Sequence, residues 1–249
     1  MLKNILLLTA FLSSNLFSGS INIAVAANVS YAIETIKKEF NKTHPNIKVN
    51  VTLGSSGKLT AQIKNGAPYE LFMSANMIYP EALYSDKIAT TKPLVYAQGS
   101  LAYLSTKKQD FTQGIKLLQS SSIDKIAIAN PKTAPYGKAA VEAMQNAGVY
   151  ENIVSKFVYA ESASQTVSYT VTAADIGFIP KSSLYSSHMT RFKEGVHYTD
   201  VNPKLYTPIS QGIVLLKNSK NASDAKKFYD FVLSDKSKKI LTDFGYLVP

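Results

Sequence analysis

Apolar residues follow strand-like and helix-like patterns in alternation along almost the whole chain. The run "INIAVAA" (21–27) predicts a buried strand, and the next segment (29–42) predicts a helix, because Ala32, Ile36 and Phe40 recur at one-turn spacing. The same order repeats in the segments "IKVNVTL", "KLTAQIKNG", "ELFMSA" and "NMIYPEALYSDK". This alternation predicts an α/β fold with a mostly parallel sheet.

Two segments are longer than an ordinary strand, and each has a glycine near its middle. They are "LVYAQGSLAYLS" (94–105), with Gly99, and "YTPISQGIVLLKN" (206–218), with Gly212. Between them the strand–helix alternation starts again, and the chain ends in two helical patterns. We expect two lobes connected by two extended crossings, because neither crossing contains a flexible linker.

At four places a predicted strand ends, small or polar residues follow, and a predicted helix begins. These loops are 26–28 ("AAN"), 54–57 ("GSSG"), 134–137 ("APYG") and 161–164 ("ESAS"). The carboxyl ends of strands in an open α/β sheet border the usual ligand crevice, and helix N-termini offer unpaired N–H donors and partial positive charge. One such loop is ordinarily only a helix cap. Four converging loops predict a site that donates hydrogen bonds to an oxyanion.

The first twenty residues have the layout of a secretory signal peptide. Lys3 precedes an apolar stretch (5–12), small residues follow, and cleavage is expected after Ser18 or Ser20. The apolar stretch is roughly half the ~20 residues that a membrane-spanning helix needs. We therefore expect export of the mature chain to the periplasm, and the absence of cysteine argues against a lipid anchor.

The composition narrows the class of partner. The 249-residue chain has no cysteine, which excludes disulfides, Fe–S clusters and thiol catalysis. Its formal net charge is +10, but the lysine pairs are scattered, and no basic stripe with interleaved aromatic residues is present. A solvated basic surface is therefore expected, and no binding to nucleic acid. A basic adhesin for anionic surfaces is an alternative.

Sequence signals for catalysis are weak. His44, His188 and His197 have no spacing that fits a metal site, and no G-x-S-x-G motif occurs. "GSSGK" lacks the four-residue gap and the hydroxyl residue after lysine that a Walker motif requires. We expect a protein that is not an enzyme and that has no cofactor and no metal site. Among enzymes, an exported hydrolase is the alternative.

Several segments, in a fixed order along the chain, match a known family. They are "AAN", "GSSGKLTAQIKNGAPYELFMSAN", "NPKTAPYGKAAVEAM", "ADIGFIPKSSL", "YTPISQGIVLLKN" and "FGYLVP". In this order and spacing, the chain resembles the periplasmic molybdate-binding proteins of ABC importers over essentially the whole mature length. The resemblance implies a two-lobed type II binding-protein fold with the ligand in the cleft between the lobes. The implied divisions are a signal peptide at 1–20, lobe 1 at 21–97 and 210–249, and lobe 2 at 98–209.

The resemblance also implies which residues contact the oxyanion. Asn28 and Ser56 would contact it from lobe 1, and the backbone amides of Tyr136 and Ala163 from lobe 2. Many members have a serine where this chain has Asn28, whose amide can still donate. Some members use a tyrosine hydroxyl where this chain has Pro180, which has no side-chain donor. The set of donors therefore differs from that of those relatives.

Together, these features predict a monomeric periplasmic protein that captures a tetrahedral oxyanion by closure of two lobes. The expected ligands are molybdate and also tungstate, and the expected partner is the permease of an ABC importer. Within the same class, a binding protein for sulfate or phosphate, or for tungstate alone, is the alternative.

Overall fold

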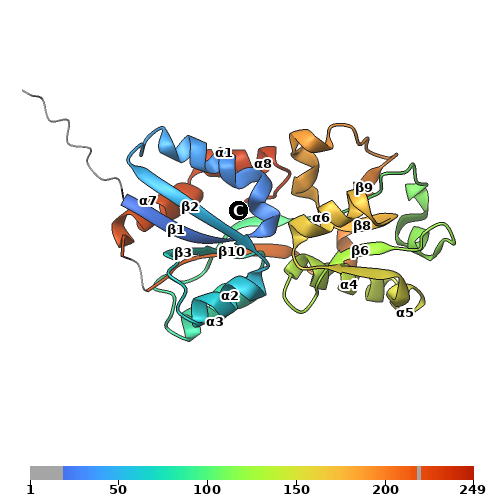
Figure 1. The fold of residues 1–249 in the computed structure, drawn as a ribbon, viewed down its shortest axis with the longest axis horizontal. Coiled ribbons are helices and arrows are strands. Elements are labelled where there is room, and N and C mark those ends of the chain that lie inside the picture. The colour runs from blue at the N-terminus through green and yellow to red at the C-terminus, as the bar shows by residue number, and fades with distance from the viewer. Residues whose placement is uncertain (1–18, 218–219) are drawn as a thin grey trace, which may run out of the picture.

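The fold consists of two bodies that lie side by side, each built on a five-stranded sheet (Figure 1). The computed structural model describes residues 19–217 and 220–249, and within these ranges no helix is long and apolar enough to cross a membrane. We call the body around the first sheet lobe 1 and the other body lobe 2. The signal peptide predicted at residues 1–20 lies outside the described residues, except for Gly19 and Ser20 at the start of β1.

Lobe 1 has the strand order β2-β1-β3-β10-β4, in which β1 is parallel to β2 and β3, and β10 is antiparallel to β3 and β4. The strands are β1 (Gly19–Ala26), β2 (Ile47–Gly54), β3 (Leu71–Met73), β4 (Leu94–Gly99) and β10 (Ile209–Leu215). Helices α1, α7 and α8 lie on one face, and α2 and α3 lie on the other (Figure 1). The helices are α1 (Ser30–Asn41), α2 (Ser56–Lys64), α3 (Ile78–Ser85), α7 (Ala222–Val232) and α8 (Asp235–Asp243).

Side chains on β1 alternate between these two layers. Ile23 and Val25 belong to the core beneath α1, α7 and α8, where Phe40 and Phe228 pack edge to face with 5.0 Å between their ring centroids. Ala24 belongs to the core beneath α2 and α3. A parallel strand that is buried on both faces needs an uninterrupted apolar sequence, which is the pattern seen at 23–27.

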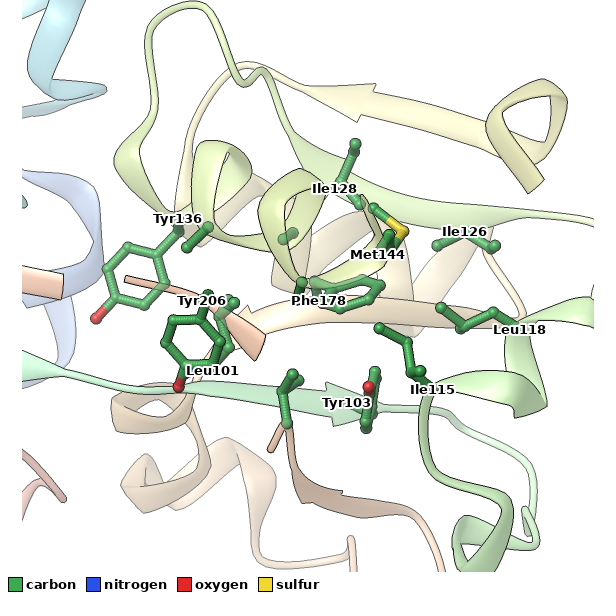
Figure 2. Close-up of a cluster of buried hydrophobic side chains, with 14 of the residues drawn as sticks. Leu101, Tyr103, Ile115, Leu118, Ile126, Ile128, Tyr136, Met144, Phe178 and Tyr206 are labelled. Atoms are coloured by element: carbon green, nitrogen blue, oxygen red, sulfur yellow. The ribbon is translucent and has the colours of Figure 1, made fainter. Parts of the chain in front are cut away.

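Lobe 2 has the strand order β7-β6-β8-β5-β9, in which β6 is parallel to β7 and β8, and β5 is antiparallel to β8 and β9. Its elements are β5 (Leu101–Leu104), β6 (Ile126–Ala129), β7 (Phe157–Ala160), β8 (Ile176–Pro180), β9 (Tyr198–Asp200), α4 (Pro135–Asn146), α5 (Tyr150–Ile153) and α6 (Ala163–Thr172). On one face of the sheet, Ile128 and Phe178 pack with Met144 of α4 (Figure 2). On the other face, Val167 of α6 packs in a core with Ile179.

The chain passes between the lobes at two extended segments, as the sequence predicts. The long strand expected at 94–105 is divided at Ser100 into β4 and β5, and the second crossing leads into β10. A pairing of the C-terminal segment with β4 at the start of the first crossing is not evident from the sequence pattern. The Gln98 amide donates to the Leu247 carbonyl at 2.7 Å, and the Leu247 amide donates to the Gln98 carbonyl at 3.0 Å. The C-terminal segment therefore braces the first crossing.

Candidate functional site

A small cavity lies where the four predicted loops meet between the lobes. The lining residues are all uncharged: Ala26, Ala27, Asn28, Gly54, Ser55, Ser56, Ala75, Ala134, Pro135, Tyr136 and Ala163. Each lining loop follows the carboxyl end of a parallel strand, β1, β2 or β3 in lobe 1 and β6 or β7 in lobe 2. The structure therefore brings the four sequence-predicted residues, Asn28, Ser56, Tyr136 and Ala163, to one cavity.

Three helices begin at this cavity. Ser56 is the first residue of α2, Ala163 is the first residue of α6, and Tyr136 follows Pro135 in the first turn of α4. Backbone N–H groups in a first turn have no acceptor within their own helix. The three amides are therefore available to a ligand, and the helix dipoles add partial positive charge at the same place. An anion can be held here by neutral groups alone.

The two serines of the "GSSG" loop are in different states. The Oγ of Ser56 accepts a hydrogen bond from the Ala75 amide at 2.9 Å, which leaves the Ser56 hydroxyl hydrogen free to donate. The Oγ of Ser55 is buried and has no hydrogen-bond partner within the described part of the chain. A buried hydroxyl without a partner is unfavourable until it forms a hydrogen bond with a ligand or a water molecule. The sequence prediction named Ser56 alone, and the structure adds Ser55.

Asn28 is held at the cavity by a buried polar network. Its Nδ2 donates to Oε1 of Gln211 at 2.8 Å and to the Tyr246 hydroxyl at 3.1 Å. Its carbonyl accepts from the Tyr246 hydroxyl at 2.8 Å and from the Ser182 hydroxyl at 3.1 Å. Its Oδ1 is buried without a partner among residues 19–217 and 220–249. Since both Nδ2 hydrogens are engaged, side-chain donation by Asn28 to a ligand requires its amide to turn over.

Gln211, on β10, is the centre of this network. Its fully buried side chain also accepts from the Tyr96 hydroxyl at 2.8 Å and donates to the Tyr136 hydroxyl at 3.4 Å. Figure 2 shows the Tyr136 ring at the edge of a core of lobe 2, with its hydroxyl turned away from Phe178. The network therefore joins the first loop of lobe 1 to the first turn of α4 in lobe 2.

Burial keeps the phenols of this network neutral. Loss of solvation raises the pKa of Tyr246 to about 12, and it raises the pKa of Tyr96 and of Tyr136 well above the ordinary value. All three phenols stay protonated at neutral pH. The network supports the cavity without adding charge to it.

Nearly all of the described fold has a counterpart among known proteins. The family model of the bacterial extracellular solute-binding proteins matches residues 21–247. The chain belongs to this family. The two-lobed fold of a solute-binding protein and the resemblance predicted from the sequence are thereby confirmed, and this is a family of binding proteins, not of enzymes.

Relatives of this solute-binding protein are similar over nearly their full length. The molybdate-binding protein ModA of Rhodobacter capsulatus is 33% identical over 232 residues, covering 92% of this chain and 89% of the relative. The ModA of Azotobacter vinelandii is 32% identical, covering 92% and 90%. The solved structure of the periplasmic molybdate-binding protein of Azotobacter vinelandii has a TM-score of 0.85 at 29% identity and covers 92% of this chain and 99% of its own. The sulfate-binding protein SubI of Mycobacterium tuberculosis H37Rv, at 13% identity and a TM-score of 0.76, shows likeness of fold alone.

Other residues that the sequence singled out lie away from the cavity of this solute-binding protein. Pro180 ends β8 opposite Leu101 and is not among the lining residues. The three histidines are also absent from the lining, and no group of three or more metal-ligating side chains occurs in the part of the chain that the structure describes. The candidate site is therefore the cavity formed by the four loops.

Proposed function

We propose that this chain captures a tetrahedral oxyanion, molybdate and also tungstate, and delivers it as a monomer to the permease of an ABC importer. One observation carries the proposal. Three helix N-termini and two serine hydroxyls converge on a small cavity between two lobes, and none of the described residues that line it has a charged side chain. The names of the relatives supply molybdate as the oxyanion.

In this proposal, neutral donors replace the water shell of the dianion when the lobes close. The donors are the Ser55 and Ser56 hydroxyls, the amides of Ser56, Tyr136 and Ala163, and Asn28. Each hydrogen bond to a charged group contributes roughly 1.5–3 kcal/mol. About six of them, less the cost of dehydration and closure, can reach the −10 to −12 kcal/mol of nanomolar binding. Because no ion pair with the ligand must break, release can follow lobe opening directly.

A donor-only cavity suits an anion without protons. A protonated oxyanion must itself donate a hydrogen bond, and the Oδ1 of Asn28 is the one lining side-chain atom that can only accept and that has no partner in the described chain, whereas the Ser55 hydroxyl can also donate. If the Asn28 amide turns over to donate, Gln211 can turn its own amide and keep the contact between them. The cavity then presents donors alone.

We also propose that the chain is exported, and that lobe 1 consists of residues 21–97 and 210–249 and lobe 2 of residues 98–209. Cleavage after Ser18 fits the first strand better than cleavage after Ser20. The Ser20 hydroxyl accepts from Asn50 at 2.9 Å, and its carbonyl accepts from Asn221 at 2.7 Å. Removal of Ser20 with the signal peptide would break both hydrogen bonds.

A thermal-shift panel tests the proposed function. Purified protein is heated with molybdate, tungstate, sulfate or phosphate at a concentration about 100-fold above the dissociation constant, where linkage adds about 2.7 kcal/mol to the free energy of unfolding. We expect the melting temperature to rise with molybdate and tungstate. A rise with sulfate or phosphate alone would assign the chain to the alternative binding proteins, and no rise with any anion would reject oxyanion capture.

A further inference from the structure

The loop at 54–57 and the first turn of α2 make two direct contacts with lobe 2 beside the cavity. The Nζ of Lys58 lies 2.6 Å from Oε1 of Glu161. The Gly57 amide donates to the Thr133 carbonyl at 2.9 Å. Lys58 also extends into a surface pocket whose other lining residues all belong to lobe 2. Lobe 1 therefore reaches both of the loops of lobe 2 that border the cavity.

Glu161 is fixed to the N-terminus of α6. Its amide donates to Oε1 of Gln165 at 2.6 Å, and the Gln165 amide donates to the Ser162 hydroxyl at 3.4 Å. These reciprocal hydrogen bonds cap the helix and leave the Glu161 backbone little freedom relative to α6. A contact at the Glu161 side chain therefore also positions Ala163, which begins α6 and lines the cavity.

Gly57 allows the lobes to approach closely at the same place. A Cβ on Gly57 would lie 2.8 Å from the Tyr79 hydroxyl, 3.0 Å from Cα of Thr133 and 3.1 Å from the Thr133 carbonyl oxygen. Backbone from the two lobes is thus in direct contact next to Lys58. The ion pair of Lys58 with Glu161 spans the two lobes at the same place as this backbone contact.

We propose that Lys58 and Glu161 are positioning residues that hold the first turn of α2 against the N-terminus of α6 and slow release of the ligand. This inference rests on the proposed function. Neither side chain lines the cavity, so the pair acts through Ser56 and Ala163, which do. The pair also neutralises Lys58, which directly follows the "GSSG" loop in the sequence.

If Lys58 instead acted as a charge on the ligand, replacement of Glu161 would change the affinity in the opposite direction. If Lys58 attracted the dianion as a charge, removal of the negative charge at Glu161 would tighten binding. If the pair holds the lobes together, removal of either partner weakens binding. The two single variants therefore distinguish positioning from attraction.

The experiment measures the dissociation rate of labelled molybdate, chased with excess unlabelled molybdate. Lys58→Ala and Glu161→Ala should each raise the rate by about two- to fivefold, the contribution of an exposed ion pair. The exchanged variant K58E/E161K should return the rate to within about twofold of wild type, since it restores the interaction. Added salt should raise the rate for wild type and for the exchanged variant, but not for the single variants.

Lys64 and Asp86 provide a matched control pair. They are 2.6 Å apart and are 45% and 47% exposed, against 51% and 56% for Lys58 and Glu161, but both belong to lobe 1. Lys64→Ala should leave the dissociation rate unchanged. A slower rate for Glu161→Ala, an equal effect of Lys64→Ala, or no recovery in the exchanged variant would overturn the proposal.

Oxyanion binding by the wild-type protein shows whether a failure concerns this inference or the proposed function. If wild type binds none of the four oxyanions, the proposed function fails, and the pair is then examined by small-angle scattering without ligand. The radius of gyration should be larger for Lys58→Ala and Glu161→Ala than for wild type and should return in K58E/E161K. Identical radii for all four proteins would overturn the positioning role.

Discussion

Nδ2 of Asn28 lies 2.8 Å from Oε1 of Gln211, although 183 residues separate them in the chain. This hydrogen bond connects the first cavity loop of lobe 1 with the second crossing between the lobes. The same glutamine reaches the Tyr136 hydroxyl of lobe 2 at 3.4 Å. A change at the crossing can therefore reach the cavity through a buried, uncharged network.

Asn28 should be at least as important for binding as Ser56. Asn28→Ala removes the side chain that Gln211 and Tyr246 hold, and Pro180 offers no phenol to compensate. We expect a loss of affinity of at least about 1.5–3 kcal/mol. Asn28→Asp should lose more, because a carboxylate beside a dianion is repelled. Oxyanion titrations of both variants decide this, and an unchanged affinity in Asn28→Ala would show that the side chain serves only the buried network with Gln211 and Tyr246.

Alanine variants of the two serines of the "GSSG" loop should have similar effects on ligand affinity but different effects on the stability of the ligand-free protein. Ser56→Ala and Ser55→Ala should each weaken binding by about 1.5–3 kcal/mol through loss of a hydroxyl donor. Ser56→Ala should also lower the stability of the ligand-free protein, because it leaves the buried Ala75 amide without an acceptor. Ser55→Ala should not, since its hydroxyl has no partner in the described chain. Calorimetric titration and urea unfolding of both variants measure the two effects; equal losses of stability would contradict the assignment.

Gly99→Ala should weaken ligand binding, although Gly99 does not line the cavity. Addition of Tyr136→Phe should restore part of the lost affinity. A Cβ at Gly99 would meet the Tyr136 hydroxyl and would lie 2.7 Å from Nε2 of Gln211. Tyr136→Phe alone removes that hydroxyl but keeps the backbone amide, so its affinity should stay within about 1 kcal/mol of wild type. The double variant should bind better than Gly99→Ala. Strictly additive effects would show that the two residues do not interact.

Alkaline pH should weaken the fold before it alters the cavity. Folded-state pKa values of Tyr96, Tyr136 and Tyr246 lie above the value of about 10 for an unfolded tyrosine. The contribution of each protonated phenol to stability is therefore complete below pH 10 and is lost as the pH rises toward 12 and above. Affinity should stay constant between pH 6 and pH 9. Urea unfolding at pH 8, 10 and 11 should show a smaller alkaline loss for Tyr246→Phe than for wild type; an equal loss would contradict this.

The chain pattern is sufficient to predict the alternating architecture and the four loops. Small residues directly after apolar strands are a local signal, and the parallel sheet brings such loops together. For this reason Asn28, Ser56, Tyr136 and Ala163, which are far apart in the sequence, line one cavity. That they contact an oxyanion stays a prediction.

The supporting network could not be predicted from the same patterns. Gln211, Tyr96 and Tyr246 occur in strands or terminal segments that are typical of core. Their contacts are long-range: Tyr96 and Gln211 are 115 residues apart, and Tyr246 and Asn28 are 218 residues apart. A glutamine within the apolar run at 206–218 was the one available signal, because a buried amide must find partners. Contacts between the lobes, such as Lys58 with Glu161, depend on how the lobes close, and no local periodicity encodes that.

Calorimetric titration of the ligand-free wild-type protein with molybdate is the most direct test of the central claim. We expect one site per chain with a free energy of about −10 to −12 kcal/mol, which corresponds to nanomolar binding, and no change when excess sulfate is present. Absence of molybdate binding, together with saturable binding of sulfate or phosphate, would contradict the account.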